Sequence, residues 1–250
     1  WSAMRWSSLS QSTKDGLRLI MDLSLGAFNR QFDARETWQQ LYLVGVRSLP
    51  IVIVTAIFAG GISAIQVSAH VVRFQAYDAV GWGFGFVVFR ELGPLLIGLM
   101  FSGRVGAFNA AELGTMKVTE QLDALRVLAI NPLNYLVGPR IVAMVVMMTA
   151  LVMVGNVFAL LGGMLTANIL VDVDPVVFWI SLTDYVRPID LFNGLAKASL
   201  FGLVIGLVSC RRGLSVEGGA PGVGRAVNQA VVASAVGIFC VDYLVTAILP

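Results

Sequence analysis

Long apolar runs alternate with short polar segments along most of the chain. A helix needs about 20 apolar residues to cross the roughly 30 Å hydrocarbon core of a bilayer, and five runs are long enough. They lie at about 48–68, 87–111, 138–170, 191–210 and 227–249. The third run exceeds one crossing, so we expect its helix to tilt, bend or project from the membrane. The pattern predicts an all-α integral membrane protein.

The first 47 residues are mixed in polarity. Apolar and small residues recur there at helical spacing, namely Trp38, Leu41, Tyr42, Gly45 and Leu49. This pattern predicts a helix that lies in the membrane interface, with its two aromatic residues at headgroup level. We therefore expect an N-terminal cytoplasmic or interfacial helical segment, 1–47, and a transmembrane domain, 48–250.

A charged segment, 112–128, separates the second and third apolar runs. Within and just after it, an apolar stripe follows helical spacing through Val118, Leu122, Leu125 and Ala129. Thr119 is expected to be the N-cap, and Asn131-Pro132 stops the helix. The sequence thus predicts a helix over 119–130 in a loop between spans. Spacing alone leaves open whether its stripe rests on lipid headgroups or fills a groove on a partner.

Lysine and arginine are concentrated in alternate loops. Segments 1–47, 112–140 and 211–225 hold most of them, whereas 69–86 and 171–190 hold one arginine each. By the positive-inside rule, the N-terminus and the 112–140 loop are expected in the cytoplasm and the C-terminus outside.

Composition narrows the class of protein. The chain is 57% hydrophobic and 13% charged, far from the charged share of about 25% in soluble domains. A net charge of +2 gives no footprint for nucleic acid. A single histidine does not suit a Ser–His catalytic triad within the membrane, and too few His and Cys residues are present for a metal site. The two cysteines, Cys210 and Cys240, lie on different apolar runs, which argues against a disulfide.

Phosphate-binding chemistry is not expected in this chain. The G-x-x-x-x-G-K-[ST] loop that cradles ATP phosphates does not occur. The glycine-rich stretch 218–224 is expected to be a tight turn between the last two spans. We therefore expect no enzyme activity and no cofactor here, with ATP and magnesium held by a separate ATPase if ATP powers the protein.

Charged residues within apolar runs cost a few kcal/mol each and are functional candidates. For Arg90, Glu91 and Glu112, which lie near run ends, we favour snorkelling to the interface. For the others, structural pairing and a cavity-lining role are equally open. The candidate charges for a lipid cavity are Arg104, Glu112, Lys197 and Asp242.

Four stretches together resemble one family of membrane proteins. They are GPLLIGLMFSGRVGA (93–107), ELGTMKVTEQLDAL followed by Asn-Pro-Leu (112–133), SVEGGAPGVGRAV (215–227) and VDYLVTAIL (241–249). They resemble the MlaE/YrbE-type permeases, which are membrane subunits of ABC transporters that move lipids between membranes. The resemblance covers roughly residues 40–250.

This resemblance implies a homodimer in the bacterial inner membrane that works with a cytoplasmic ABC ATPase. It also implies an Mce-domain substrate-binding partner outside, in some systems a small regulatory subunit, and a phospholipid or related lipid as substrate. The lipid cavity is expected at the dimer centre, from the first, second and fifth spans. The 119–130 helix becomes the ATPase-coupling helix, through Thr119, Glu120, Leu122, Asp123, Leu125 and Arg126.

The residues alone leave two other functions open. One is a membrane scaffold that anchors a peripheral partner, which needs no lipid-accessible cavity. The other is an ion-coupled carrier, for which we expect broken helices and polar residues at the midplane. Such polar residues are sparse in these runs.

Overall fold

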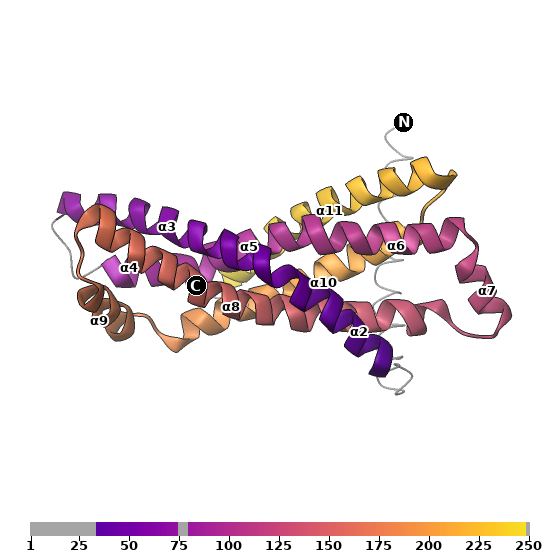
Figure 1. The fold of residues 1–250 in the computed structure, drawn as a ribbon, viewed down its shortest axis with the longest axis horizontal. Coiled ribbons are helices and arrows are strands. Elements are labelled where there is room, and N and C mark those ends of the chain that lie inside the picture. Colours follow the sequence, from indigo (N-terminus) through magenta and orange to yellow (C-terminus); the bar gives the residue numbers. More distant parts are fainter. Residues whose placement is uncertain (1–33, 75–79, 249–250) are drawn as a thin grey trace.

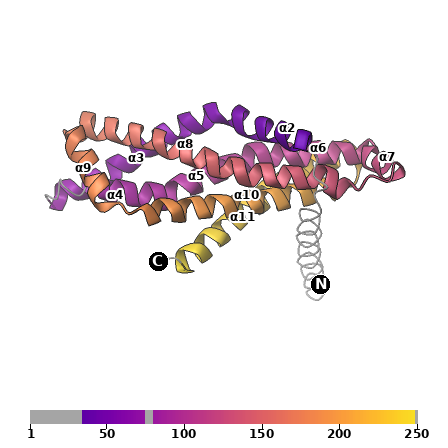
Figure 2. The same cartoon turned by 90° about the horizontal axis from the view of Figure 1, so that it is seen from below.

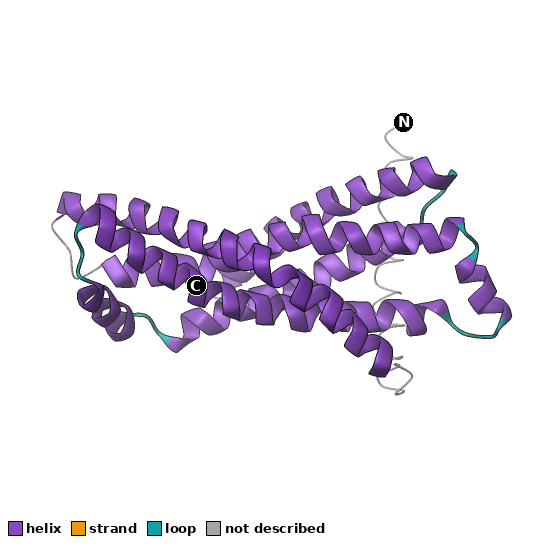
Figure 3. Ribbon diagram, in the orientation of Figure 1, coloured by secondary structure: helices purple, strands orange, loops and turns teal. Residues whose placement is uncertain are grey.

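The structure is a computed structural model that describes residues 34–74 and 80–248. Within these residues every regular element is helical and the connecting loops are short (Figure 3). The α-helices are α2 (Ala34–Gly45), α3 (Leu49–Phe74), α4 (Val80–Val87), α5 (Gly93–Phe101), α6 (Ala107–Val118), α7 (Gln121–Val127), α8 (Gly138–Val171), α9 (Pro175–Tyr185), α10 (Pro188–Leu214) and α11 (Gly219–Ile248). A 3-10 turn, η1 (Val46–Ser48), joins α2 to α3, and η3 (Val88–Leu92), η4 (Ser102–Gly106) and η5 (Leu133–Val137) are π-helical turns.

Five helical runs are long and apolar enough to cross a membrane. They are Arg35–Ser68, Val80–Val118, Tyr135–Leu170, Pro188–Leu214 and Gly219–Ile248. All five predicted spans are therefore confirmed, and the protein is an all-α, multi-pass membrane protein. The third run contains α8, whose 34 residues measure about 51 Å along the axis. As expected, this helix is longer than the hydrocarbon core is thick.

The predicted N-terminal helix is present as α2. Its residues Trp38 and Tyr42 are exposed, while the helix packs against α8. The chain continues through η1 into α3 without a break, so the expected boundary at 47 falls inside one helical run. The division into two segments stays a prediction, and residues 1–33 lie outside the described ones.

The second span contains two π-turns, η3 and η4, separated by α5. Pro94, the second residue after η3, has no backbone N–H to give to an α-helical bond, which suits the wider turn there. Because π-turns occur mostly as single insertions at functional positions, the charges on these turns are of special interest. Arg90 and Glu91 lie on η3, and Arg104 lies on η4.

Glycines allow the long helices to touch along their backbones. A Cβ on Gly60 of α3 would lie 2.0 Å from the Ala159 carbonyl oxygen of α8, and one on Gly162 would lie 2.2 Å from that of Ile57. A Cβ on Gly202 of α10 would likewise lie 2.7 Å from the Met144 carbonyl oxygen of α8. Small-residue faces thus pack helices against one another within one chain.

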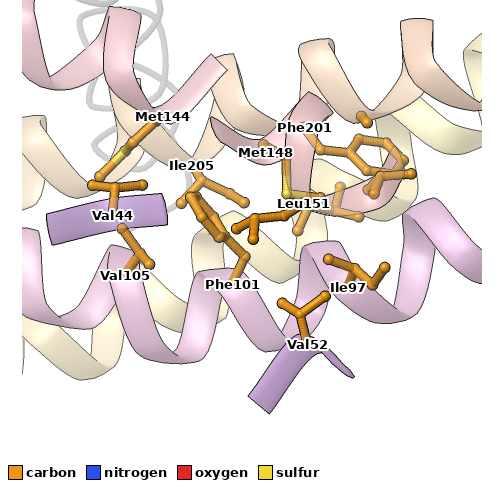
Figure 4. Close-up of a cluster of buried hydrophobic side chains, with 13 residues drawn as sticks. Val44, Val52, Ile97, Phe101, Val105, Met144, Met148, Leu151, Phe201 and Ile205 are labelled. Carbon is orange, nitrogen blue, oxygen red and sulfur yellow. The ribbon is translucent and has the colours of Figure 1, made fainter. Parts of the chain in front are cut away.

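The largest apolar core lies where α3, α5, α8, α10 and α11 meet. Figure 4 shows its centre, where Phe101, Met148 and Phe201 lie among other buried apolar side chains. At one end of the molecule α9 lies across the bundle, and at the opposite end α7 forms the tip (Figures 1 and 2). These two ends are called the α9 end and the α7 end below.

The glycine-rich stretch 218–224 is not a loop, which corrects the expected turn. The turn is confined to 215–218, and α11 begins at Gly219. Gly218 and Gly219 have positive φ values of 83° and 69°, so the glycines permit the reversal and then enter the helix.

Candidate functional site

The helix at the α7 end is shorter than predicted, and Thr119 is not its N-cap. Helix α6 runs on to Val118. The Thr119 hydroxyl donates to the Thr115 carbonyl of α6, 2.9 Å away, and so does not cap α7. The reversal falls on Glu120, whose φ of 59° is left-handed, and α7 follows as Gln121–Val127. A single helix over 112–128 would have continued α6 away from the protein, whereas the turn at Glu120 folds α7 back onto it.

The C-terminal end of α7 is closed by a Schellman motif. Ala129 has a φ of 59°, and its N–H donates to the Arg126 carbonyl at 3.0 Å. The Ile130 N–H donates to the Leu125 carbonyl, also at 3.0 Å. Left-handed residues thus bracket α7 on both sides and fix its direction.

Half of the predicted apolar stripe packs inside the protein, while Val118 and Ala129 are exposed. Leu122 is only 4% exposed and joins a core cluster with Leu113, Val137 and Cys210, and Leu125 packs against that cluster. Neither leucine is therefore free to fill a partner's groove directly. Val127 and Leu128, which are off the stripe, are 87% and 69% exposed. Sequence periodicity missed them, although two adjacent apolar residues in a charged segment were a signal.

The exposed surface of α7 also carries charge. Glu120, Asp123 and Arg126 are exposed, and Asp123 and Arg126 pair at 2.7 Å, a contact of little energy in solvent. Lys117 is turned inward, since its Nζ donates to the Leu214 carbonyl at the end of α10, 2.8 Å away. A cavity of about 280 Å³ lies under α7, lined by Lys117, Leu122 and Leu214 among others.

Glu112 belongs to a polar network at the base of α7, so the snorkelling interpretation is wrong for it. Arg140 of α8 is 2% exposed and pairs with the Glu112 carboxylate at 2.9 Å. It also donates to Asn109 Oδ1 at 2.8 Å, and Asn109 Nδ2 donates to Ser209 Oγ at 2.8 Å. The network joins α6, α8 and α10. Arg140 was missed because it lies at the start of an apolar run, where snorkelling is the usual outcome.

A second network surrounds Lys197 of α10, which is 1% exposed. Its Nζ lies 2.5 Å from Glu91 Oε2, 3.0 Å from Asp242 Oδ1 and 2.8 Å from the Thr246 hydroxyl. Glu91 therefore pairs inside the bundle and does not snorkel. Lys197 thus pairs with two carboxylates, and this cluster joins η3, α10 and α11.

Arg90 does not snorkel either. It is 9% exposed, lies 3.5 Å from the Asp190 carboxylate and places its guanidinium 5.3 Å from the centre of the Phe86 ring. Both contacts favour a cation inside the bundle.

Arg104 is separate from these networks. Its side chain is exposed and lines a cavity of about 180 Å³ that contains neither Lys197 nor Asp242. The cavity is bordered by α2, η1, η4, α6 and α8, with walls that include Leu43, Val44, Arg47, Val105 and Met144. The structure thus does not bring Arg104, Lys197 and Asp242 into one cavity of this chain.

Cys210 is buried in α10 and Cys240 is exposed on α11, and neither is in a disulfide. Within residues 34–74 and 80–248 no group of three or more His, Cys, Asp or Glu side chains could hold a metal ion.

Comparison with known families decides what kind of protein has this architecture. Residues 37–248 match the model of the family described as Permease MlaE. The chain belongs to the MlaE permease family. Its five spans, its tip helix α7 and its buried charges are therefore features of an ABC transporter permease.

Relatives of this MlaE permease come from several lineages. It is 42% identical over 208 residues to a probable ABC transporter permease protein of Rickettsia felis, covering 83% of this chain and 80% of that one. A probable ABC transporter permease protein of Synechocystis is 35% identical over 229 residues, with coverage of 92% and 86%. The chloroplastic protein TRIGALACTOSYLDIACYLGLYCEROL 1 of Arabidopsis thaliana is 33% identical over 213 residues, with coverage of 85% and 61%.

Proposed function

We propose that this permease moves phospholipids or related lipids between the bacterial inner membrane and another envelope membrane, driven by a separate ATPase. The ATPase binds ATP and magnesium, and this chain supplies the membrane path. The observation that carries the proposal is α7, a short helix held firmly at the tip of the bundle with two apolar side chains exposed.

The α7 surface suits a docking contact with the ATPase. Leu122 and the Lys117 bond to Leu214 fix α7 to the ends of the spans, so a push on α7 reaches them. Val127 and Leu128 supply the apolar part of the contact, and Glu120, Asp123 and Arg126 surround it with charge. Apolar anchors ringed by polar groups are typical of protein contacts.

The positive-inside rule supports the orientation. The α7 loop carries lysine and arginine and the α9 end carries aspartates, so we place α7 in the cytoplasm and the C-terminus outside. An ATPase on α7 then has access to cytoplasmic ATP.

The substrate class rests on the family and on one relative's name. The chloroplastic relative is named for trigalactosyldiacylglycerol, a glycolipid with two acyl chains. Neither cavity described above could hold a whole diacyl lipid, which supports a larger cavity formed by two copies of the chain. Helix α11 contributes exposed Val232, Val236 and Phe239 for such a surface. An Mce-domain protein outside and a small regulatory subunit complete the proposed assembly.

The docking surface is tested by charge substitutions on α7. Val127→Asp and Leu128→Asp should each reduce co-purification of the ATPase and abolish ATP-dependent lipid transfer between vesicles. Val176→Asp is the matched control, because Val176 is 62% exposed at the α9 end. If a variant that carries both Val127→Asp and Leu128→Asp still binds the ATPase fully and transfers lipid, the docking surface is refuted.

The same transfer assay separates the proposal from its rivals. A scaffold would bind its partner but transfer no lipid with ATP. An ion-coupled carrier would transfer substrate without the ATPase when an ion gradient is applied. Of the three functions, only the permease predicts lipid transfer that requires both ATP and the ATPase.

A further inference from the structure

The Arg104 cavity, bordered by α2, η1, η4, α6 and α8, carries positive charge that the described residues do not balance. Arg47 and Arg104 both line it. Neither is in an ion pair with any carboxylate of residues 34–74 and 80–248. Glu112 also borders the cavity, but its carboxylate is bonded to Arg140. Two guanidinium groups that line one cavity and pair with none of these carboxylates favour binding of an anion.

The level of the cavity in the membrane indicates which anion is available. The sequence prediction puts Arg47 at the boundary between the interfacial segment, 1–47, and the first apolar run, 48–68, although α2 and α3 form one helical run in the structure. Arg104 borders the same cavity and lies on η4, which continues into α6 toward α7. The abundant anions at this level of a bilayer are lipid phosphates.

The remaining walls suit the part of a lipid next to its phosphate. Leu43, Val44, Val105 and Met144 are apolar, and Figure 4 shows Val44, Val105 and Met144 together at one end of the central core. A volume of about 180 Å³ equals roughly six water molecules. It admits a phosphate and glycerol unit, while the acyl chains would remain in the bilayer.

We propose that Arg47 and Arg104 bind the phosphate of an anionic phospholipid in the leaflet at the α7 end. Arginine suits this role because its planar fork of N–H donors matches phosphate oxygens. The site prefers lipids whose headgroups carry net negative charge. Neutral lipids, among them galactolipids, bind more weakly. Because the inference concerns binding and not transfer, it is separate from the transport function proposed above.

Photo-crosslinking of the full chain with its co-expressed partners, without ATP, tests the site. A benzophenone amino acid replaces Leu43, and the protein is placed in bilayer discs of equal parts phosphatidylglycerol and phosphatidylcholine. Mass spectrometry then gives the ratio of the two lipids among the adducts. We expect phosphatidylglycerol to be enriched, by about fivefold for each arginine. Adducts in the ratio of the bilayer would overturn the proposal.

Matched variants identify the groups responsible. Arg47→Gln and Arg104→Gln should each lower the enrichment about fivefold, whereas Arg104→Lys should keep most of it. Arg187→Gln removes an exposed arginine at the α9 end and should change nothing. The readout is a ratio, so a variant that folds in lower yield still gives a result. Unchanged enrichment in the double glutamine variant would refute the assignment to these arginines.

Two further conditions fix the chemical class. Replacing phosphatidylglycerol by monogalactosyldiacylglycerol should remove the enrichment, and added inorganic phosphate should leave the phosphatidylglycerol adducts in place. Enrichment of the galactolipid would overturn the preference for anions. Loss of the adducts on adding inorganic phosphate would show a site for free phosphate and overturn the lipid assignment.

Discussion

Arg140 and Glu112 form an ion pair, with 2.9 Å between Nη1 and Oε2, that joins the two helices from which the α7 loop projects. Glu112 lies on α6, before the loop, and Arg140 lies on α8, after it. The pair therefore closes the base of the loop, and α7 cannot move as an isolated flap while it is intact.

The pair can be tested by a double-mutant cycle. Glu112→Gln should lower the free energy of unfolding by about 3 kcal/mol, because it leaves the Arg140 guanidinium buried without its carboxylate. Adding Arg140→Met should recover a large part of this loss, since no buried charge then remains. Thermal unfolding of the four proteins in detergent measures the coupling. Strictly additive effects would contradict a direct interaction.

The Lys197 network predicts an order of effects. Lys197→Met leaves Glu91 and Asp242 close together without a cation, and should lower stability by about 3–5 kcal/mol. Asp242→Asn leaves one lysine with one carboxylate, and should cost about 1 kcal/mol. The thermal unfolding midpoints of the two variants check this order. An Asp242→Asn variant as unstable as Lys197→Met would show that Asp242 and not Glu91 is the main partner.

The contact of α3 with α8 predicts a large effect of one methyl group. Gly60→Ala places a Cβ against the Ala159 carbonyl, so the helices must separate at a cost of about 1–3 kcal/mol or more. Gly224→Ala is the control, because nothing lies within 4 Å of a Cβ there, and α11 should gain up to about 1 kcal/mol. Equal unfolding midpoints for both variants would argue against the close contact.

The proposed orientation predicts labelling from opposite sides. In a chain with Cys240→Ser, single cysteines at Gln121 and Asp184 are both exposed, at the α7 and α9 ends. A membrane-impermeant maleimide added to intact cells whose outer membrane has been made permeable should label position 184 only. Labelling of position 121 under the same conditions would reverse the topology.

Hydrophobic runs predicted the spans because the bilayer forces backbone polar groups into helices wherever the chain is apolar. Local periodicity did not reveal which face of α7 is buried. Leu122 is covered by Val137 of η5 and Cys210 of α10, which are distant in sequence. The ion pairs were missed for the same reason, since Lys197 and Glu91 lie 106 residues apart. Snorkelling was the better interpretation of a single charge, and only the packing of helices supplied the partners.

Helix α8 runs without a proline beyond its first turn from the α7 end to the α9 end. Its close backbone contact with α3 at Gly162 lies about 36 Å from Gly138 and about 14 Å from Val171, at 1.5 Å per residue. A substitution that weakens this contact therefore acts near the α9 end, about 36 Å from the end of α8 that adjoins the α7 loop.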